Sequence, residues 1–343
     1  MMKKKLLIAI LLFVCCIQCV KVCAQDPHFS QYFSSPMTVN PALTGKDIAD
    51  WRVLTNFRSQ WWGSSETAPF TTTALSLEKA FHMGTNEKSS FGIGVSLLSD
   101  ASNAGILKNN FFTLGAAYNI ALDGKGDEQL GLGLEAGYTN RLIDADKLEF
   151  QSQLGSMGFQ RTPSGDPINI LSNHYFDMNV GVHYSKNFAA SHWGYRLGVS
   201  VFHVSTPRES VYNSTAYNIN RRYSLQAGLV FKQANGNELN LSSVNDNQGS
   251  NNVLTIGALY KFRVSNYDNG IQNFNLGIWD RFDDSFYPYI GLEGRNWLAG
   301  FTYDVINETN KALNSVQSIE FSLGWHFNSR KKTDSRSANI VIY

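Results

Sequence analysis

The sequence predicts an all-β protein, a transmembrane antiparallel up-and-down β-barrel of about fourteen strands. Three observations predict it. Apolar residues alternate with polar or small ones in segment after segment from Trp51 to Phe327, and aromatic residues are frequent, with 22 Phe, 15 Tyr and 7 Trp. Beyond residue 24, no apolar run is long enough for a membrane-spanning helix. A bilayer core offers no water to the backbone, so only helices and closed barrels cross it. A secreted β-sandwich with the same alternation is the alternative.

The first residues indicate export. Met1–Lys5 is basic, residues 6–20 are apolar and small residues precede Gln25, which is the layout of a cleaved signal peptide. We therefore expect residues 1–24 to be removed and the mature protein to reach the outer membrane. The apolar run is shorter than the ~20 residues that span a bilayer, which argues against an anchoring helix. All four cysteines lie in this segment, so the mature chain has none for a disulfide or a zinc site.

Each predicted strand is a run of about ten residues with period-two alternation, bounded by turn residues. In 128–140, for example, Leu132 and Leu134 share one face, whereas Gly133 and Glu135 share the other. The predicted strands are 50–59, 69–79, 89–98, 108–120, 128–140, 175–184, 194–203, 221–231, 237–246, 251–262, 273–279, 285–293, 295–304 and 316–327. An even number of strands returns both ends of the barrel to the same side of the membrane.

The lengths of the connections predict which end of the barrel faces outward. The three longest, 141–174, 204–220 and 305–315, all follow odd-numbered strands, whereas most connections after even-numbered strands are short and turn-like. Long loops face the outside in outer-membrane barrels. The short turns and both ends of the barrel are therefore expected on the periplasmic side.

A barrel of this width encloses more space than its wall can fill, because eight strands already give an interior that side chains fill. Polar residues opposite the apolar face are expected to point into the lumen, either as packing that keeps it hydrated or as groups that select what passes. The lumen candidates are Arg52, Asn56, Arg58, Glu135, Arg196, Arg222, Gln226 and Glu320. The same alternation places His203 on the apolar face.

Residues 25–48, between the signal peptide and the first strand, are predicted to be extended, because three prolines prevent a continuous helix or a central strand. The aromatic side chains of this segment need apolar cover. We expect the segment to dock, either as a plug in the periplasmic mouth of the barrel or on a partner. The barrel is expected to occupy 49–328, followed by a polar tail over 329–343.

Four motifs follow one another at the mature N-terminus: FSQYF at 29–33, NPALTG at 40–45, NFRSQWWG at 56–63 and PFTTTALSLE at 69–78. Together they resemble the opening of the PorP/SprF family, outer-membrane proteins of the type IX secretion system of Bacteroidota. The connection 141–174 is long for this family, and the C-terminus lacks the cysteine found in many members. The docking residues that the first two motifs supply are Phe29, Ser30, Gln31, Tyr32, Phe33, Asn40, Pro41, Ala42 and Gly45.

The resemblance implies a function without chemistry. Such proteins work beside the translocon or the periplasmic ring, or hold a secreted cargo or adhesin at the cell surface, and several are tied to gliding motility. The expected partners are therefore outer-membrane lipid, type IX secretion components and a secreted protein. A porin or transporter for small or hydrophobic solutes is the alternative, which the width and charged lumen of the barrel favour.

Other functions lack the residues that they need. Neither an H-E-x-x-H nor a G-x-S-x-G motif is present, so no enzymatic activity is expected. The acidic residues within 280–284 and 144–146 do not have calcium-loop spacing, and neither a metal nor another cofactor is predicted. The net charge of +1 gives no attraction to nucleic acid, and neither a nucleic-acid partner nor a small-molecule substrate is expected.

Overall fold

The computed structural model describes most of the chain between Asp26 and Phe327. The residues described are 26–62, 68–83, 88–144, 147–160, 172–208, 218–265, 270–306 and 317–327. The predicted signal peptide (1–24) and polar tail (329–343) lie outside them.

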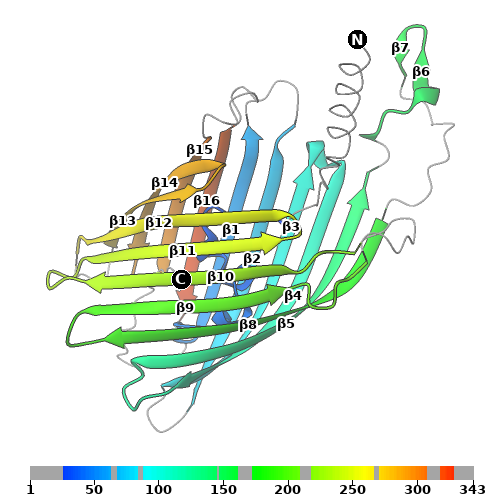
Figure 1. Ribbon diagram of the computed structural model, residues 1–343. Coiled ribbons are helices and arrows are strands. Elements are labelled where there is room, and N and C mark those ends of the chain that lie inside the picture. The colour runs from blue at the N-terminus through cyan, green and yellow to red at the C-terminus, as the bar shows by residue number, and fades with distance from the viewer. Residues whose placement is uncertain are drawn as a thin grey trace, which may run out of the picture.

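Fourteen strands form one closed antiparallel barrel, in which each strand pairs with its neighbours along the chain and β1 pairs with β16 (Figure 1). The barrel strands are β1 (Trp51–Trp62), β2 (Phe70–Met83), β3 (Ser89–Ser102), β4 (Leu107–Ala121), β5 (Glu128–Ile143), β8 (Ser172–Phe188), β9 (Trp193–Phe202), β10 (Arg222–Lys232), β11 (Glu238–Gln248), β12 (Asn251–Arg263), β13 (Ile271–Arg281), β14 (Ser285–Gly294), β15 (Trp297–Ile306) and β16 (Gln317–Phe327).

The predicted fold class is confirmed, and each predicted strand range overlaps one strand of the barrel. Several strands are longer than predicted; β8, for instance, covers Ser172–Phe188 rather than 175–184. A small separate hairpin of β6 (Leu154–Gly155) and β7 (Gly158–Phe159) was not predicted. It lies within the long connection after β5 and projects beyond the barrel in Figure 1.

The two faces of the wall differ in polarity. In β10, Tyr223 and Leu225 are exposed on the outer face, whereas Ser224 and Gln226 are buried on the lumen face. Exposed Leu, Val, Ile and Phe side chains recur on the outer face of most other barrel strands. Such a surface is stable in lipid and would be unfavourable in water. Within the described residues, no helix combines the length and apolarity of a membrane-spanning helix.

The connections after β5, β9 and β15 are the longest, and all lie at the same end of the barrel because successive strands alternate in direction. We call this the long-loop end. The opposite, short-turn end holds the start of β1 and the end of β16, which pair at Trp51 and Phe327.

Candidate functional site

The N-terminal segment, residues 26–48, lies inside the barrel, and most of it from Phe29 to Ile48 is buried. The prediction that it is extended is wrong. The segment makes three short 3-10 turns, η1 (Tyr32–Ser34), η2 (Pro36–Thr38) and η3 (Pro41–Leu43). Pro36 and Pro41 each begin one of these turns. Proline suits this first position because the N–H that it lacks would have no partner within the turn. Pro36 and Pro41 therefore shape tight turns instead of keeping the chain extended.

The segment runs along the lumen from one end to the other. At the long-loop end, the Asp26 backbone N–H donates to Gln248 Oε1 at 3.0 Å, near the end of β11. At the short-turn end, Lys46 Nζ donates to Gln129 Oε1 at 2.8 Å, near the start of β5. The contacts are therefore not confined to the short-turn mouth, where one of the two predicted alternatives placed a plug.

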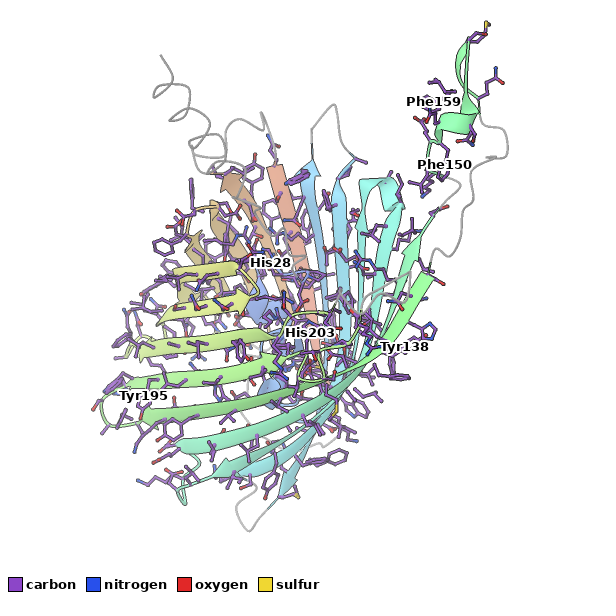
Figure 2. The ribbon with its side chains drawn as sticks, turned by 45° about the vertical axis from the view of Figure 1, so that its right-hand side comes forward. His28, Tyr138, Phe150, Phe159, Tyr195 and His203 are labelled. Carbon is purple, nitrogen blue, oxygen red and sulfur yellow. The ribbon has the colours of Figure 1, made fainter. Side chains whose placement is uncertain are left out.

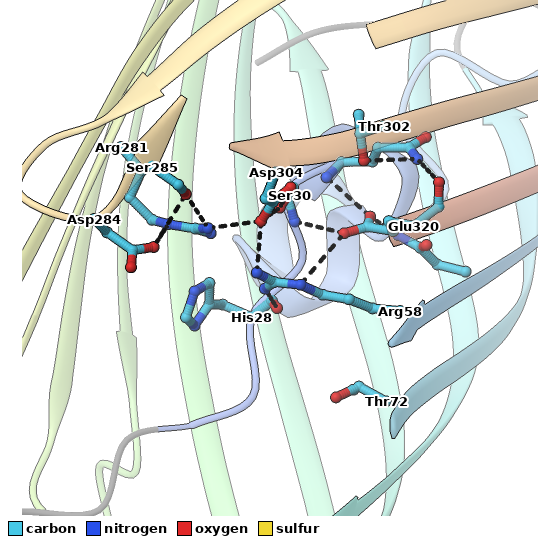
Figure 3. A network of polar contacts seen from close by, with 12 residues as sticks. His28, Ser30, Arg58, Thr72, Arg281, Asp284, Ser285, Thr302, Asp304 and Glu320 are labelled. Atoms are coloured by element: carbon cyan, nitrogen blue, oxygen red, sulfur yellow. Dashed lines mark hydrogen bonds and ion pairs between the residues drawn. The ribbon is translucent and has the colours of Figure 1, made fainter. Parts of the chain in front are cut away.

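Carboxylates from the last two strands bind the first part of the segment, at Ser30 and Gln31 (Figure 3). Glu320 of β16 accepts the backbone N–H groups of Ser30 and Gln31 at 2.7 and 2.9 Å. Asp304 of β15 accepts the Ser30 hydroxyl at 2.8 Å. The same Asp304 carboxylate is paired with Arg58 at 2.9 Å and with Arg281 at 2.8 Å, so its buried charge is compensated. The backbone of the segment is thus part of a charged network of the wall.

The aromatic residues of FSQYF fill the lumen beside this network. The Phe33 ring lies 5.2 Å from the Trp279 ring and 5.3 Å from the Tyr289 ring, and all three are buried. The Tyr32 hydroxyl donates to Ser242 Oγ at 2.6 Å, and Trp279 Nε1 donates to the same oxygen at 3.0 Å. The apolar cover that these rings need is therefore supplied by the strands β11, β13 and β14.

The NPALTG motif contacts the opposite wall. Asn40 caps η3 by accepting the Ala42 N–H at 2.9 Å, and it donates to Gln226 Oε1 at 2.9 Å and to the Val182 carbonyl at 3.0 Å. The backbone at Pro41 approaches β5 so closely that a Cβ at Gly133 would come within 2.2 Å of the Pro41 carbonyl carbon. A glycine is therefore needed in the wall at this point.

Gly45 ends the motif with a φ of +67°, a conformation that side chains disfavour. Its N–H donates to Glu78 Oε2 at 2.8 Å. Arg52 of β1 donates to the same carboxylate twice, from Nε to Oε1 at 3.1 Å and from Nη2 to Oε2 at 2.7 Å. A buried, bidentate ion pair thus fixes the segment just before the chain turns into β1.

A second ionic cluster holds Asp26 at the long-loop end. The imidazole of His203 lies between two carboxylates, with Nε2 2.8 Å from Asp26 and Nδ1 2.6 Å from Asp177. Arg222 Nε is 3.3 Å from the Asp26 carboxylate. Burial alone would lower the pKa of His203, but Asp26 and Asp177 outweigh it and raise that pKa to about 9. Burial would raise the pKa of Asp26, but His203 and Arg222 hold it well below its usual range.

The remaining lumen candidates lie near the segment. Glu135 is buried and accepts from Asn179 at 3.2 Å, and its second oxygen has no partner among the described residues. Asn56 donates to Glu320 at 2.8 Å, whereas Arg196 is half-buried on the lumen side of β9. A hollow at the long-loop end has a mixed lining of apolar and charged side chains. These include Met37, Leu98, Phe111, Glu135, Phe202 and Arg222.

Several residues of the site were not predicted. Glu78 and Asp304 lie on the lumen faces of β2 and β15, where extending the alternation would have found them. His203 could not be found in this way, because its φ of 57° turns the chain out of strand geometry just after β9 and brings its side chain inward (Figure 2). Its predicted place on the apolar face is therefore wrong. Within the described ranges, no three His, Cys, Asp or Glu side chains are placed to hold a metal ion.

A closed antiparallel barrel with an apolar outer face and a polar, ion-paired lumen defines an outer-membrane β-barrel protein. A family model described as "Type IX secretion system membrane protein PorP/SprF" matches residues 22–325. The chain belongs to this family, whose members are secretion-system membrane proteins.

Solved barrels of similar architecture include a FadL homologue from Pseudomonas aeruginosa, at 10% sequence identity and a TM-score of 0.49 over 84% of this chain and 93% of that chain. The toluene transporter TbuX from Ralstonia pickettii has 12% identity and a TM-score of 0.46 over 86% of this chain and 94% of its own. At sequence identities this low, the likeness shows a shared barrel architecture and nothing more. No curated protein sequence matches the chain significantly.

Proposed function

We propose that this protein is a non-enzymatic outer-membrane component of type IX secretion that supports the export or the surface anchoring of a secreted protein. Membership of the PorP/SprF family over residues 22–325 is the observation that carries this proposal. Its partners are the translocon or the periplasmic ring on one side and a secreted cargo or adhesin on the other. Where that adhesin drives gliding, the protein acts in motility as well.

The occupied lumen supports a role in recognition rather than in solute passage. The N-terminal segment crosses the lumen and contacts strands on opposite sides of it, through Glu320 of β16 and Gln226 of β10. A solute passing straight through would have to displace buried, charge-assisted hydrogen bonds, which are strong. We propose that the segment keeps the lumen closed and braces the barrel, so that the loops and the strand ends are left to bind partners.

Deletion of the gene followed by quantitative proteomics of the cell surface tests the function. We expect one or a few type IX cargo proteins to disappear from the surface and to return when the wild-type protein is supplied. Colony spreading measured on the same strains reports on motility. Unchanged display of every type IX cargo would contradict the proposal.

A further inference from the structure

Strand β8 is longer than the partner on one of its sides. Its ladder with β5 continues out to the pair Leu142–Ser172 at the long-loop end. Its ladder with β9 stops at the pair Val180–Val201. One further backbone hydrogen bond follows, from Val204 N–H to the Met178 carbonyl at 3.0 Å. Within the described residues, the outer part of β8, residues 172–177, is therefore paired on one side only.

The chain that leaves β9 turns over the lumen face of β8 instead of continuing along its edge. His203 and Thr206 have φ values of 57° and 45°, which bend the backbone out of strand geometry. His203 and Ser205 then contact the lumen-facing carboxylate of Asp177, at 2.6 and 2.9 Å. These contacts are made by side chains, and among the described residues of the turn the bond from Val204 N–H to the Met178 carbonyl is the only backbone hydrogen bond to β8.

The uncovered edge presents backbone groups in strand spacing. Successive residues of a strand direct their backbone N–H and C=O groups to opposite sides. The backbone groups of His174 and Phe176 therefore point to the same side as those of Met178, which is the side of β9. Phe176 is 75% exposed, compared with 49% for Phe321, whose strand is paired on both sides. The Phe176 ring lies 5.3 Å from that of Tyr138, which covers it from the β5 side only. An edge of this kind is a template for an added strand.

We propose that the outer edge of β8, from Ser172 to Asp177, docks an extended segment of the secreted protein, which joins the wall as an additional β-strand. This proposal rests on the proposed function and names how the secreted partner is held. Residues of that segment facing outward are apolar, because they continue the surface made by Phe176 and Met178. Backbone hydrogen bonds supply the affinity, and these outward side chains supply the specificity.

The geometry favours a single strand over a second copy of this barrel. The edge points along the wall into the space beyond the end of β9, and the paired strands β9 and β10 lie directly below that space. A single extended segment needs the width of one strand, whereas a second barrel would bring its own paired strands toward β9 and β10. The edge also lies at the long-loop end, which faces the secreted protein in an outer-membrane barrel.

Photo-crosslinking in cells tests the position of the docked strand. Benzoylphenylalanine replaces Phe176 in one strain and Phe321, an outward-facing Phe of a strand paired on both sides, in a matched control strain. The probe is the surface protein whose display the gene deletion abolishes. We expect an adduct at position 176 on one short segment of that protein, and none at 321. Equal adducts at both positions, or an adduct of 176 only with another copy of this chain, would overturn the proposal.

The backbone contribution is tested separately from the side chain. Phe176→Pro removes the free N–H, whereas Phe176→Ala keeps it, and proline is tolerated at a strand edge whose N–H is unpaired. We expect about a tenfold loss of cargo binding for Phe176→Pro and at most about a twofold loss for Phe176→Ala. Heat-dependent electrophoretic mobility verifies that both barrels are folded. Equal effects of the two substitutions would count against strand addition.

A peptide competition keeps the test valid if Phe176→Pro does not fold. A synthetic peptide of the crosslinked segment is added to the wild-type protein, with alternate amides N-methylated in one of the two registers. Methylation of the amides that face β8 should abolish competition, whereas methylation of the other set should leave it. Competition by both peptides would refute the docking mode.

The two proposals fail in different ways. If deletion leaves cargo display intact, the proposed function is wrong. If deletion abolishes display but Phe176→Pro displays cargo normally and position 176 gives no adduct, only the docking site is wrong.

Discussion

At the scale of single residues, the lumen is built from carboxylates that each serve several donors. Glu320 accepts two backbone N–H groups of the N-terminal segment and the amide of Asn56, all within 2.9 Å. Glu78 combines the N–H of Gly45 with a bidentate pair to Arg52. A buried donor that loses its acceptor cannot form a hydrogen bond with water instead. Each of these carboxylates therefore contributes more to stability than an ordinary surface charge does.

Replacing Glu320 with alanine should therefore loosen the segment and destabilise the protein. We expect the free energy of unfolding to fall by roughly 3 to 5 kcal/mol, the usual effect of removing one partner from a buried ionic network. Chemical denaturation in detergent micelles measures this change. Glu128→Ala is the control, because Glu128 pairs with Lys186 at the exposed end of the barrel and should have little effect. Similar midpoints for the two variants would contradict the expected role of Glu320.

The contact between Asp26 and His203 should depend on pH. Because the pKa of His203 is raised from 6.5 to about 9, its stabilising effect is full below pH 6.5 and is lost as the pH rises through 9. Because the pKa of Asp26 is lowered, its effect is present above pH 3.8 and is lost only in stronger acid. The contact is therefore strongest between about pH 4 and 6.5.

Hydrogen exchange of the amides in residues 26–33, corrected for intrinsic rates, measures this dependence. Protection should fall between pH 6.5 and 9.5 by an amount on the order of 3 kcal/mol if the segment opens as a unit. His203→Gln should make the profile flat over this range. A flat profile in the wild-type protein would show that His203 does not hold the segment.

Individual residues also mark the limit of what the sequence predicts. The lumen positions of Arg58 and Glu320 follow from period-two alternation, because a strand presents alternate side chains to opposite faces. Asp26 could not be placed by any local pattern, since its partners His203 and Arg222 are far away in the chain. The left-handed backbone at His203 breaks the alternation, and only the folded structure shows it.

At the scale of elements, the strands were predicted far better than the N-terminal segment that precedes them. Within each strand, side chains alternate between those that face lipid and those that face the lumen, so the residue range of a strand can be predicted from its own sequence. The turns of the N-terminal segment are fixed by distant contacts, such as those of Asn40 with Gln226 and Val182. The segment has no periodicity of its own, and its three prolines are compatible with both an extended chain and a series of tight turns.

The fit between the segment and β5 depends on one glycine. We expect Gly133→Ala to displace the segment, because its Cβ would overlap the backbone of Pro41 at 2.2 Å. Overpacking of this kind costs about 1 to 3 kcal/mol. Gly137→Ala is a matched control on the same face of β5, where the nearest atom would be 3.8 Å away. Proteolytic sensitivity of residues 26–48 should rise for Gly133→Ala only; equal sensitivity of both variants would contradict this account.

At the scale of the whole molecule, the barrel closes through its own ladders, and the N-terminal segment lies in the space that they enclose. Deleting residues 26–45 should leave a folded barrel, because β1 and β16 pair directly over most of their lengths. Without the segment, the lumen of a fourteen-stranded barrel is too wide for its wall side chains to fill. Planar-bilayer recordings should therefore show channels for the deletion variant.

The wild-type protein should conduct little in the same recordings, with heat-dependent electrophoretic mobility verifying that the deletion variant is folded. Steady, large conductance of the wild-type protein would favour the porin or transporter alternative instead. Loss of the folded band in the deletion variant would contradict the view that the wall is self-sufficient.

The N-terminal segment contacts both the first and the last strand of the barrel, which pair with each other. The carbonyl of His28 accepts from Arg58 of β1, while Ser30 and Gln31 bind Glu320 of β16. During assembly, the first strand emerges with this segment already attached, many residues before its final neighbour arrives. The segment therefore acts as an internal template: its backbone N–H groups at Ser30 and Gln31 bind Glu320 of the last strand and help to set the register of that strand. A chain without it would be expected to close more slowly, even where the finished cylinder is equally stable.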